Sequence, residues 1–359
     1  MHRAQAAEIL SLAFAMPVEG ALEWLALLGP DGLHYVDDQG LLGVFETGHW
    51  WRGGAVAGGG VAGVAIAPQH RGRGLASRLL AQMLRKERDR GLSLSTLYPA
   101  TEPVYRKAGY ERAGVRYQFE LPLASLPTPR AKASLELAGP AALAPLYDRW
   151  ASQRDGYLVR GQQMWSRLLE PHRGPRPRAY LIVEDQPTGY FLVSQTALSE
   201  GYHDLTLHDY AVHTDTARDA LIAFLGNHRS LGRNLRWWGG LPDPIVDALP
   251  EQSCAISIPH TWMLRLVDPV AAFAARPFPV QARLEAELRL SDSIFEENAG
   301  PYRLSIEDGV GRLEPGGSGQ HPLSIGQLAA LYSGYLTPRR LGLGEALWAS
   351  TLPAMAESF

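Results

Sequence analysis

The chain has 359 residues, of which 46% are hydrophobic and 20% charged, and its formal net charge is −3. This length predicts two or three domains of a globular protein. The charge argues against a dedicated nucleic-acid binder, whose domain is normally strongly basic. No apolar run approaches a membrane span and the N-terminus lacks a signal-peptide layout, so we expect a cytoplasmic protein without membrane contact. The single cysteine, Cys254, excludes an intrachain disulfide and thiolate metal clusters.

The pattern of apolar residues, glycines and prolines in residues 1–121 predicts an α/β unit. Its central feature is the run Val-Ala-Gly-Val-Ala-Ile-Ala at 61–67, which we expect to be a buried strand that a glycine-rich hairpin separates from residues 55–60. A turn at 69–74 follows, and then a helix with leucines and a methionine on one stripe. The other elements expected in this unit are a helix at 4–14, strands at 34–37, 41–46 and 92–97, a short helix at 102–109 and a strand at 115–121.

Two further units are expected along the chain. Residues 122–134 have the composition of a linker, and residues 135–261 repeat the order of elements of the first unit, with a hairpin around 185–189. The glycine-arginine turn is missing from this repeat, so we interpret it as degenerate and without phosphate-binding capacity. Residues 262–359 form the third unit, with a small helix, three strands at 282–290, 302–306 and 309–314, and an amphipathic helix at 324–336.

The turn Gln69-His70-Arg71-Gly72-Arg73-Gly74 holds the most informative signal. A helix N-terminus presents unpaired N–H groups and the positive end of the helix dipole, which together favour a phosphate or pyrophosphate. Gly72 and Gly74 allow the backbone to curl into such a nest, and Arg71 and Arg73 add charge-assisted donors. The pattern is neither a mononucleotide P-loop nor a Rossmann turn, so the turn is built for another phosphate ligand.

These residues resemble the GNAT superfamily of N-acetyltransferases. The turn matches Q-x-x-G-x-G, the coenzyme A pyrophosphate motif of that superfamily, and Tyr105-Arg106-Lys107-Ala108-Gly109-Tyr110 matches its later Y-x-x-x-G-[FY]. The order of the three units further resembles the bacterial enhanced-intracellular-survival (Eis) acetyltransferases. The resemblance implies an α/β (α+β) fold with tandem GNAT-like mixed sheets flanked by helices, followed by a sterol-carrier-protein-like α+β domain. It also implies a hexamer.

The resemblance assigns roles to individual residues. The strand residues Val64 and Ile66 would pair with the pantetheine arm of acetyl-CoA, and Arg71, Gly72, Arg73, Gly74 and Leu75 would hold its pyrophosphate. Tyr105 would be the general acid. The α-carboxylate of the last residue, Phe359, would be the general base, and no metal is implied.

Acetyl transfer requires a neutral amine, and deprotonating a lysine-like amine at pH 7 costs roughly 4.6 kcal/mol. A carboxylate is a poor equilibrium base for that proton, so we favour a base that acts during attack, directly or through water. Proton transfer from Tyr105 to the thiolate of coenzyme A is uphill by roughly 2 kcal/mol, which is small enough for a general acid. A backbone N–H of the 64–66 strand would stabilise the carbonyl oxygen.

The amine acceptor stays open between an aminoglycoside-like and a lysine-like compound. Phe14, Trp24 and Trp50 are candidates for its pocket, and Glu357 is a candidate partner for a cationic group. His203, His208 and His213 are spaced by five, which fits neither one strand face nor one helix face, so we expect no metal site there. Two alternative functions remain: a carrier of lipid or another apolar ligand through the third unit, and a sensor of acyl-CoA without turnover.

Overall fold

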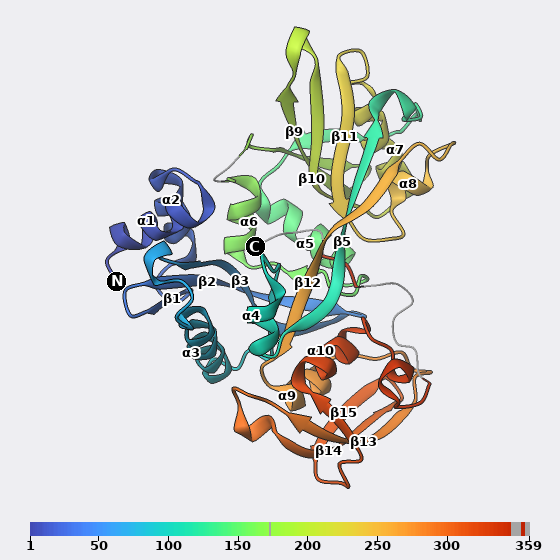
Figure 1. Ribbon diagram of the computed structural model, residues 1–359. Coiled ribbons are helices and arrows are strands. Elements are labelled where there is room, and N and C mark those ends of the chain that lie inside the picture. The colour runs from blue at the N-terminus through green and yellow to red at the C-terminus, as the bar shows by residue number, and fades with distance from the viewer. Residues whose placement is uncertain (172–173, 346–352, 356–359) are drawn as a thin grey trace.

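The computed structural model describes residues 1–171, 174–345 and 353–355. In these residues a 12-stranded sheet runs through the first two units, and a separate four-stranded sheet forms the third (Figure 1). Neighbouring strands of the large sheet follow the order β1-β2-β3-β4-β12-β5-β11-β10-β9-β8-β6, and β7 pairs with β2. The predicted mixed α/β fold is confirmed.

The first unit contains the predicted strand-turn-helix. Its elements are α1 (Arg3–Phe14), α2 (Val18–Leu28), β1 (Leu33–Val36), β2 (Gly40–Trp51), β3 (Gly54–Ile66), α3 (Leu75–Asp89), β4 (Leu94–Leu97), α4 (Glu102–Lys107) and β5 (Glu111–Pro122).

The helices of this unit cover both faces of its sheet. Leu41 and Phe45 of β2 join the core beneath α1 and α2, whereas Leu42 and Val44 join the core beneath α3 and α4. Successive side chains of a strand point to opposite faces, so the two helix pairs lie on opposite sides of the sheet. No single helix in the described residues is long and apolar enough to cross a membrane; α1 and α2, bent by 115°, pass that test only as a pair, by length and composition.

The glycine-rich hairpin expected before residue 61 is absent. Strand β3 is unbroken from Gly54 to Ile66, and the turn to β2 lies at Arg52 and Gly53, both with positive φ. The glycines inside β3 serve close packing instead: a Cβ at Gly58 would lie 2.9 Å from the Leu94 carbonyl oxygen. The prediction was wrong because consecutive glycines mark close approach between strands as well as turns.

The second unit repeats the core of the first. Its elements are β6 (Ser134–Leu137), α5 (Pro140–Ala151), β7 (Leu158–Val159), α6 (Gln162–Leu169), β8 (Arg178–Val183), β9 (Pro187–Ala197), β10 (His203–Val212), α7 (Asp215–Gly226), β11 (Gly232–Gly239) and α8 (Pro244–Asp247). An antiparallel pair, a helix and a parallel strand follow in the same order in β2-β3-α3-β4 and in β9-β10-α7-β11.

Strand β12 (Ala255–Leu266) joins the units, and the sequence did not indicate it. It pairs with β4 through 263–266 and with β5 along most of its length, while β5 continues to pair with β11 (Figure 1). The predicted boundary between residues 261 and 262 therefore falls inside a strand. The division into residues 1–121, 135–261 and 262–359 stays a prediction.

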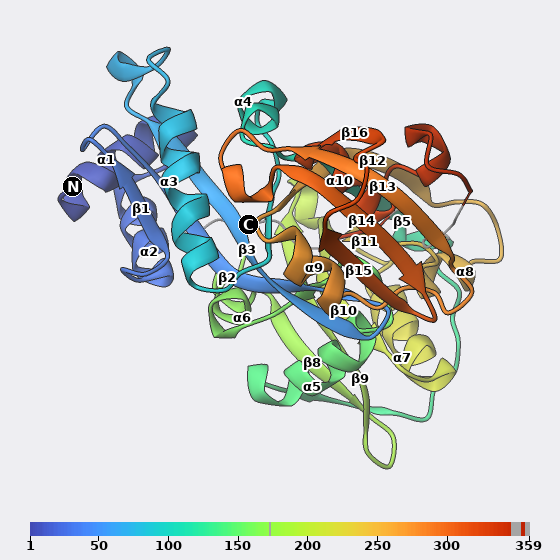
Figure 2. The same ribbon diagram turned by 90° about the horizontal axis from the view of Figure 1, so that it is seen from below.

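The third unit has a second, smaller sheet packed on two helices (Figure 2). Its elements are α9 (Pro269–Ala275), β13 (Leu284–Ser291), β14 (Gly300–Glu307), β15 (Val310–Pro315), β16 (His321–Ser324) and α10 (Ile325–Ser333). Burial alternates along β13 and β14, as expected for a sheet with one solvated face. Leu288, Leu304 and Leu328 are at most 1% exposed, so this core is filled by its own side chains.

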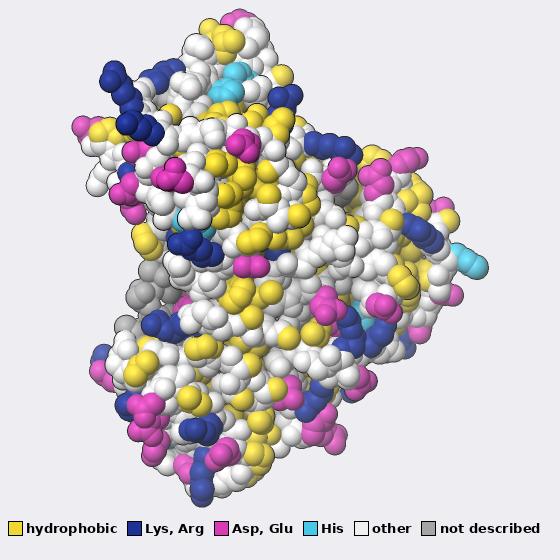
Figure 3. Space-filling model, turned by 180° about the vertical axis from the view of Figure 1, so that it is seen from behind, with side chains coloured by type: hydrophobic (Ala, Val, Ile, Leu, Met, Phe, Trp, Pro, Cys, Tyr) yellow, Lys and Arg dark blue, Asp and Glu magenta, His cyan; other side chains and the backbone are white. Residues whose placement is uncertain are grey.

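Charged side chains of both signs are interspersed on the surface. On the face shown in Figure 3, among the described residues, no stripe of a single sign runs across the molecule. A groove that binds nucleic acid requires a basic stripe. This face therefore lacks the charge pattern of a nucleic-acid-binding surface.

Candidate active site

The turn before α3 has the geometry that its glycines predict. Gly72 and Gly74 have φ of 78° and 76°, and a Cβ at either position would meet nothing within 4 Å. Gly74 is the N-cap of α3 and no side chain caps the helix, so the first N–H groups stay available. The side chain of Arg73 is exposed, whereas the Arg71 Nε donates to the Ile66 carbonyl oxygen at 3.2 Å. The turn thus has the open geometry that an anion site requires, and Arg71 supports its shape.

A β-bulge shifts the pairing of β3 with β2 just before this turn. Leu41 pairs with Ala65 and Gly43 with Ala62, so β3 contains one extra residue there, and Gly63 has φ of 62°. On its other edge β3 pairs with β4 only from Gly58 to Val61. In the described residues the edge at 62–66 therefore lacks a strand partner on that side. An extended amide chain such as pantetheine can pair there.

Tyr105 shares one hydrophobic core with the predicted cofactor residues. Its side chain, on α4, is 6% exposed and packs in the same cluster as Leu75, with Val64 and Ile66 against its edge. Burial raises the pKa of the Tyr105 hydroxyl, which keeps the hydroxyl protonated at neutral pH. Tyr110 lies deeper, its hydroxyl 2.7 Å from the Ser95 Oγ, and has a structural role.

The aromatic residues proposed for the acceptor pocket do not form one wall. Trp24 is 6% exposed and lies over the bulge, where a Cβ at Gly63 would meet its ring at 2.5 Å. Phe14 is exposed at the end of α1. Trp50 packs against the core of the second unit, and its indole N–H is buried without a hydrogen-bond partner in the described residues. Glu357 and Phe359 lie outside the described residues.

The segment 353–355 returns to the first unit and pairs beside β5. The Val115 N–H donates to the Pro353 carbonyl at 2.9 Å, and the Met355 N–H donates to the Val115 carbonyl at 3.1 Å. The Tyr98 hydroxyl donates to the Met355 carbonyl at 3.3 Å. Tyr98 directly follows β4, at the carboxyl end of a central strand, where ligand-binding residues of α/β sheets gather. That position was the available signal for Tyr98, and the sequence analysis missed it.

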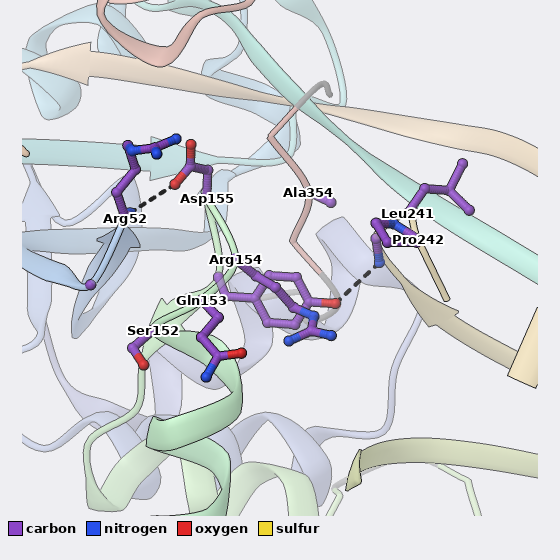
Figure 4. A pocket seen from close by; sticks show the side chains of 11 residues that line it. Arg52, Ser152, Gln153, Arg154, Asp155, Leu241, Pro242 and Ala354 are labelled. Atoms are coloured by element: carbon purple, nitrogen blue, oxygen red, sulfur yellow. Dashed lines mark hydrogen bonds between the residues drawn. The ribbon is translucent and has the colours of Figure 1, made fainter. Parts of the chain in front are cut away.

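A cavity of about 580 Å3 lies between the first and the second unit (Figure 4). The Arg52 N–H donates to the Asp155 Oδ1 at 2.8 Å across one wall, and the Gly240 N–H donates to the Tyr157 hydroxyl at 3.1 Å across another. Ala354 completes the lining. Arg52 lies at the opposite end of β3 from the glycine turn, and the 13 residues of that strand span about 40 Å. The cavity is therefore remote from the glycine turn.

The second unit has a helix N-terminus of the opposite electrostatic character. Thr214 caps α7, accepting from the Ala217 N–H, and Asp215 is in the first turn. The Thr188 and Thr214 hydroxyls each donate to the Glu184 Oε1 at 2.6 Å and lower the pKa of that carboxyl. A carboxylate already occupies the region where a phosphate would bind, which supports the interpretation of a degenerate repeat.

The three histidines of this unit have separate partners. His208 contacts the Ser194 Oγ at 2.7 Å, His213 donates to the Leu146 carbonyl at 3.0 Å, and the His203 ring meets His228 edge-on. Within the part of the chain that the structure describes, no group of three or more histidine, cysteine or acidic side chains could hold a metal.

Comparisons with known proteins agree with this architecture. Residues 4–113 and 156–266 each match an acetyltransferase (GNAT) domain family, and residues 269–357 match the sterol carrier protein domain. The GCN5-related N-acetyltransferase of Anabaena variabilis is 31% identical, and its crystal structure superposes with a TM-score of 0.90 over 99% of this chain and 97% of that one.

Two Eis proteins are also similar. The N-acetyltransferase Eis of Mycobacterium tuberculosis is 26% identical over 71% of this chain and 65% of its own length. Eis1 of Mycobacterium abscessus has the same fold, with a TM-score of 0.78 over 100% of this chain and 98% of that one at 21% identity. The chain belongs to the GCN5-related N-acetyltransferases and is similar to the Eis proteins among them. It is an acetyltransferase, and acetyl-CoA is the cosubstrate of such domains.

Proposed function

We propose that the chain transfers acetyl from acetyl-CoA to a primary amine, aminoglycoside-like or lysine-like, by direct attack of the amine on the thioester. The observation that carries this proposal is the adjacency of three features: the open turn at 71–74, the bulged edge of β3 and the buried Tyr105. The first would hold pyrophosphate, the second would hold pantetheine, and the third would lie beside the thioester. Val64, Ile66 and Leu75 pack in or against the same hydrophobic cluster as Tyr105.

Tyr105 is the proposed general acid. As the tetrahedral intermediate collapses, the C–S bond breaks and the Tyr105 hydroxyl gives its proton to the departing sulfur. Burial keeps the tyrosine protonated before that step, but the raised pKa also makes the transfer more costly than the roughly 2 kcal/mol expected for an unperturbed tyrosine. The negative charge that develops on the sulfur as the C–S bond breaks has to favour this proton transfer enough to offset the extra cost.

The α-carboxylate of Phe359 is the proposed base. Met355 hydrogen-bonds to Tyr98 at the end of β4, and the four residues that follow Met355 span at most about 14 Å. The carboxyl end of β4, which Tyr98 directly follows, is within that reach. The carboxylate would accept a proton from the amine as its nitrogen bonds to the acetyl carbon, directly or through water.

The remaining assignments follow from the family and from the local geometry. Phe14, Trp24 and Trp50 stay proposed for the acceptor region, with the Trp24 ring packed against the bulge at Gly63. Glu357 is proposed to bind a cationic group of the acceptor. We also propose a cytoplasmic hexamer. The alternative function as an apolar-ligand carrier gains no support from the filled core of the third unit.

The substitution Tyr105→Phe tests the acid. We expect kcat to fall by about 10²–10⁴, because a positioned acid contributes that much, while the dissociation constant of acetyl-CoA stays within about twofold. Stopped-flow thiol release and calorimetric titration measure the two quantities. Tyr110→Phe is the matched control, since it removes a buried hydroxyl from the neighbouring ring without touching the proposed chemistry. Equal turnover in Tyr105→Phe and wild type would remove Tyr105 from the mechanism.

A further inference from the structure

His49, on β2, is held in one orientation at the centre of the molecule. It is 1% exposed and stacks on Trp262 of β12, with ring centroids 5.5 Å apart. Its Nδ1 lies 2.9 Å from the Gly156 carbonyl oxygen, and its Nε2 lies 3.0 Å from the Thr96 Oγ1. A carbonyl only accepts, so Nδ1 carries the proton and Nε2 accepts from the threonine hydroxyl. The neutral ring therefore satisfies both partners.

The loop that His49 contacts is hydrogen-bonded to the end of β2 and to the turn that follows it. The Gly156 N–H donates to the Trp50 carbonyl at 2.9 Å, and the Trp50 N–H donates to the Tyr157 carbonyl at 2.7 Å. The Arg52 N–H donates to the Asp155 side chain. Residues 155–157 thus form a loop of the second unit whose position is set by β2 of the first.

The opposite side of the same loop supports the C-terminal segment. The Ala354 N–H donates to the Asp155 carbonyl at 3.1 Å. Gly156 has φ of 91°, and a Cβ there would lie 3.0 Å from the Ala354 carbonyl oxygen and 3.1 Å from Pro353. Gly156 alone therefore separates the His49 ring from the C-terminal segment 353–355. Beyond that segment lie β5 and Tyr98.

We propose that His49 is a positioning residue for acetyl transfer: through Gly156 it sets where residues 353–355 run, and thereby the point from which the proposed base, four residues further along the chain, has to reach the thioester. The inference rests on the proposed role of Phe359 as the base. Thr96 extends the same connection to β4, the strand whose end carries Tyr98. One buried imidazole thus ties the cofactor-binding sheet, the second unit and the C-terminal segment together.

Two substitutions separate the contacts of His49. The amide nitrogen of an asparagine superposes on the histidine Nδ1, so His49→Asn retains a donor towards the Gly156 carbonyl. The amide nitrogen of a glutamine superposes on the histidine Nε2, so His49→Gln retains only a hydrogen-bond partner for Thr96. We expect His49→Gln to lower kcat at least tenfold with an unchanged dissociation constant for acetyl-CoA. His49→Asn should recover most of that loss. A purely structural role predicts equal kcat for two variants of equal thermal stability, and that result would overturn the proposal.

Amide hydrogen exchange reports the position of the segment without relying on catalysis. In His49→Gln, the amides of Ala354 and Met355 should exchange at least tenfold faster than in wild type, and in His49→Asn they should exchange at close to the wild-type rate. Amides of β14, in the sheet of the third unit, serve as the internal reference. Unchanged exchange at 354 and 355 would contradict the proposal even if turnover fell.

A double-mutant cycle with a chain extended beyond Phe359 completes the test. If His49 acts through the chain end, the extension and His49→Gln are non-additive, and His49→Gln costs the extended enzyme less than twofold. Additive losses would show that His49 acts by another route. If extension leaves the wild-type rate unchanged, the proposed base fails, whereas the exchange experiment still decides whether His49 positions the segment.

Discussion

At the scale of single residues, burial determines the protonation state on which the proposed chemistry depends. Tyr105 and His49 are both buried, and in both cases the neutral form is favoured: burial raises the pKa of the tyrosine and lowers that of the histidine to about 4. Tyr105 is therefore kept as an acid, and His49 is kept as a neutral hydrogen-bonding ring. Neither group changes charge near pH 7.

The low pKa of His49 predicts an acid-dependent loss of stability. The unfolded chain binds a proton at this histidine near pH 6.5 and the folded chain only near pH 4. Stability from His49 is therefore complete above pH 6.5 and lost as the pH falls through 4. The difference of about 2.5 pKa units corresponds to about 3 kcal/mol. The midpoints of urea unfolding of wild type and His49→Phe, each measured at pH 7.5 and 4.5, test this loss. We expect the midpoint to fall more in wild type than in His49→Phe, and an equal fall in both proteins would contradict the low pKa of His49.

The position of Tyr105 could be predicted from the sequence, whereas the role of His49 could not. Tyr105 belongs to a local pattern with a glycine and a second tyrosine, so its place could be inferred. His49 is a lone histidine in a strand, and its partners Thr96, Gly156 and Trp262 are 47 to 213 positions away along the chain. Only the packed sheet brings them together, and no local spacing records that contact.

At the scale of elements, the strand-turn-helix of β3 and α3 is where local rules suffice. The stripe of leucines predicted the helix, and two glycines predicted the turn, because both depend on neighbours in sequence. The glycine-rich hairpin expected between residues 55–60 and 61–67, and the unrecognised strand β12, were errors of another kind. Both depend on distant partners: Leu94 beside Gly58, and β4 and β5 on either side of β12.

The glycine turn yields a prediction with an internal control. Gly74→Ala places a Cβ on a residue with φ of 76°, which costs about 1 kcal/mol, and the strained nest should bind acetyl-CoA at least fivefold more weakly. Gly91, at the other end of α3, has φ of 79° and equally open surroundings. Gly91→Ala should lower the melting temperature to a similar degree and leave the dissociation constant unchanged. Calorimetric titration compares the two, and equal weakening in both would argue against the turn as the anion site.

At the scale of the whole molecule, the two acetyltransferase-like units share one sheet. β12 lies between β4 and β5, and β5 passes from the first unit to pair with β11 of the second. Domain order could be inferred from repeated patterns, but this exchange of strands could not, because it depends on which edges remain open after each unit folds. It brings residues 155–157 and 353–355 against β2 and β5.

The shared sheet predicts that the first unit does not fold alone. A fragment of residues 1–122 lacks β12, which leaves the edges of β4 and β5 exposed and unpaired. We expect this fragment to show no cooperative thermal transition by circular dichroism. Co-expression with residues 123–359 should restore one, and cooperative melting of the isolated fragment would show that β12 is dispensable.

The proposed mechanism depends on the free carboxylate at the chain end, and one measurement isolates that group. Ligation of a synthetic C-terminal peptide gives the protein with Phe359 as either a carboxylate or a primary amide, which differ in charge and basicity but hardly in size. Single-turnover acetyl transfer from bound acetyl-CoA should be at least 10²-fold slower in the amide, with unchanged affinity for acetyl-CoA. Equal single-turnover rates in the two proteins would contradict the account, because the base would then have to be another group.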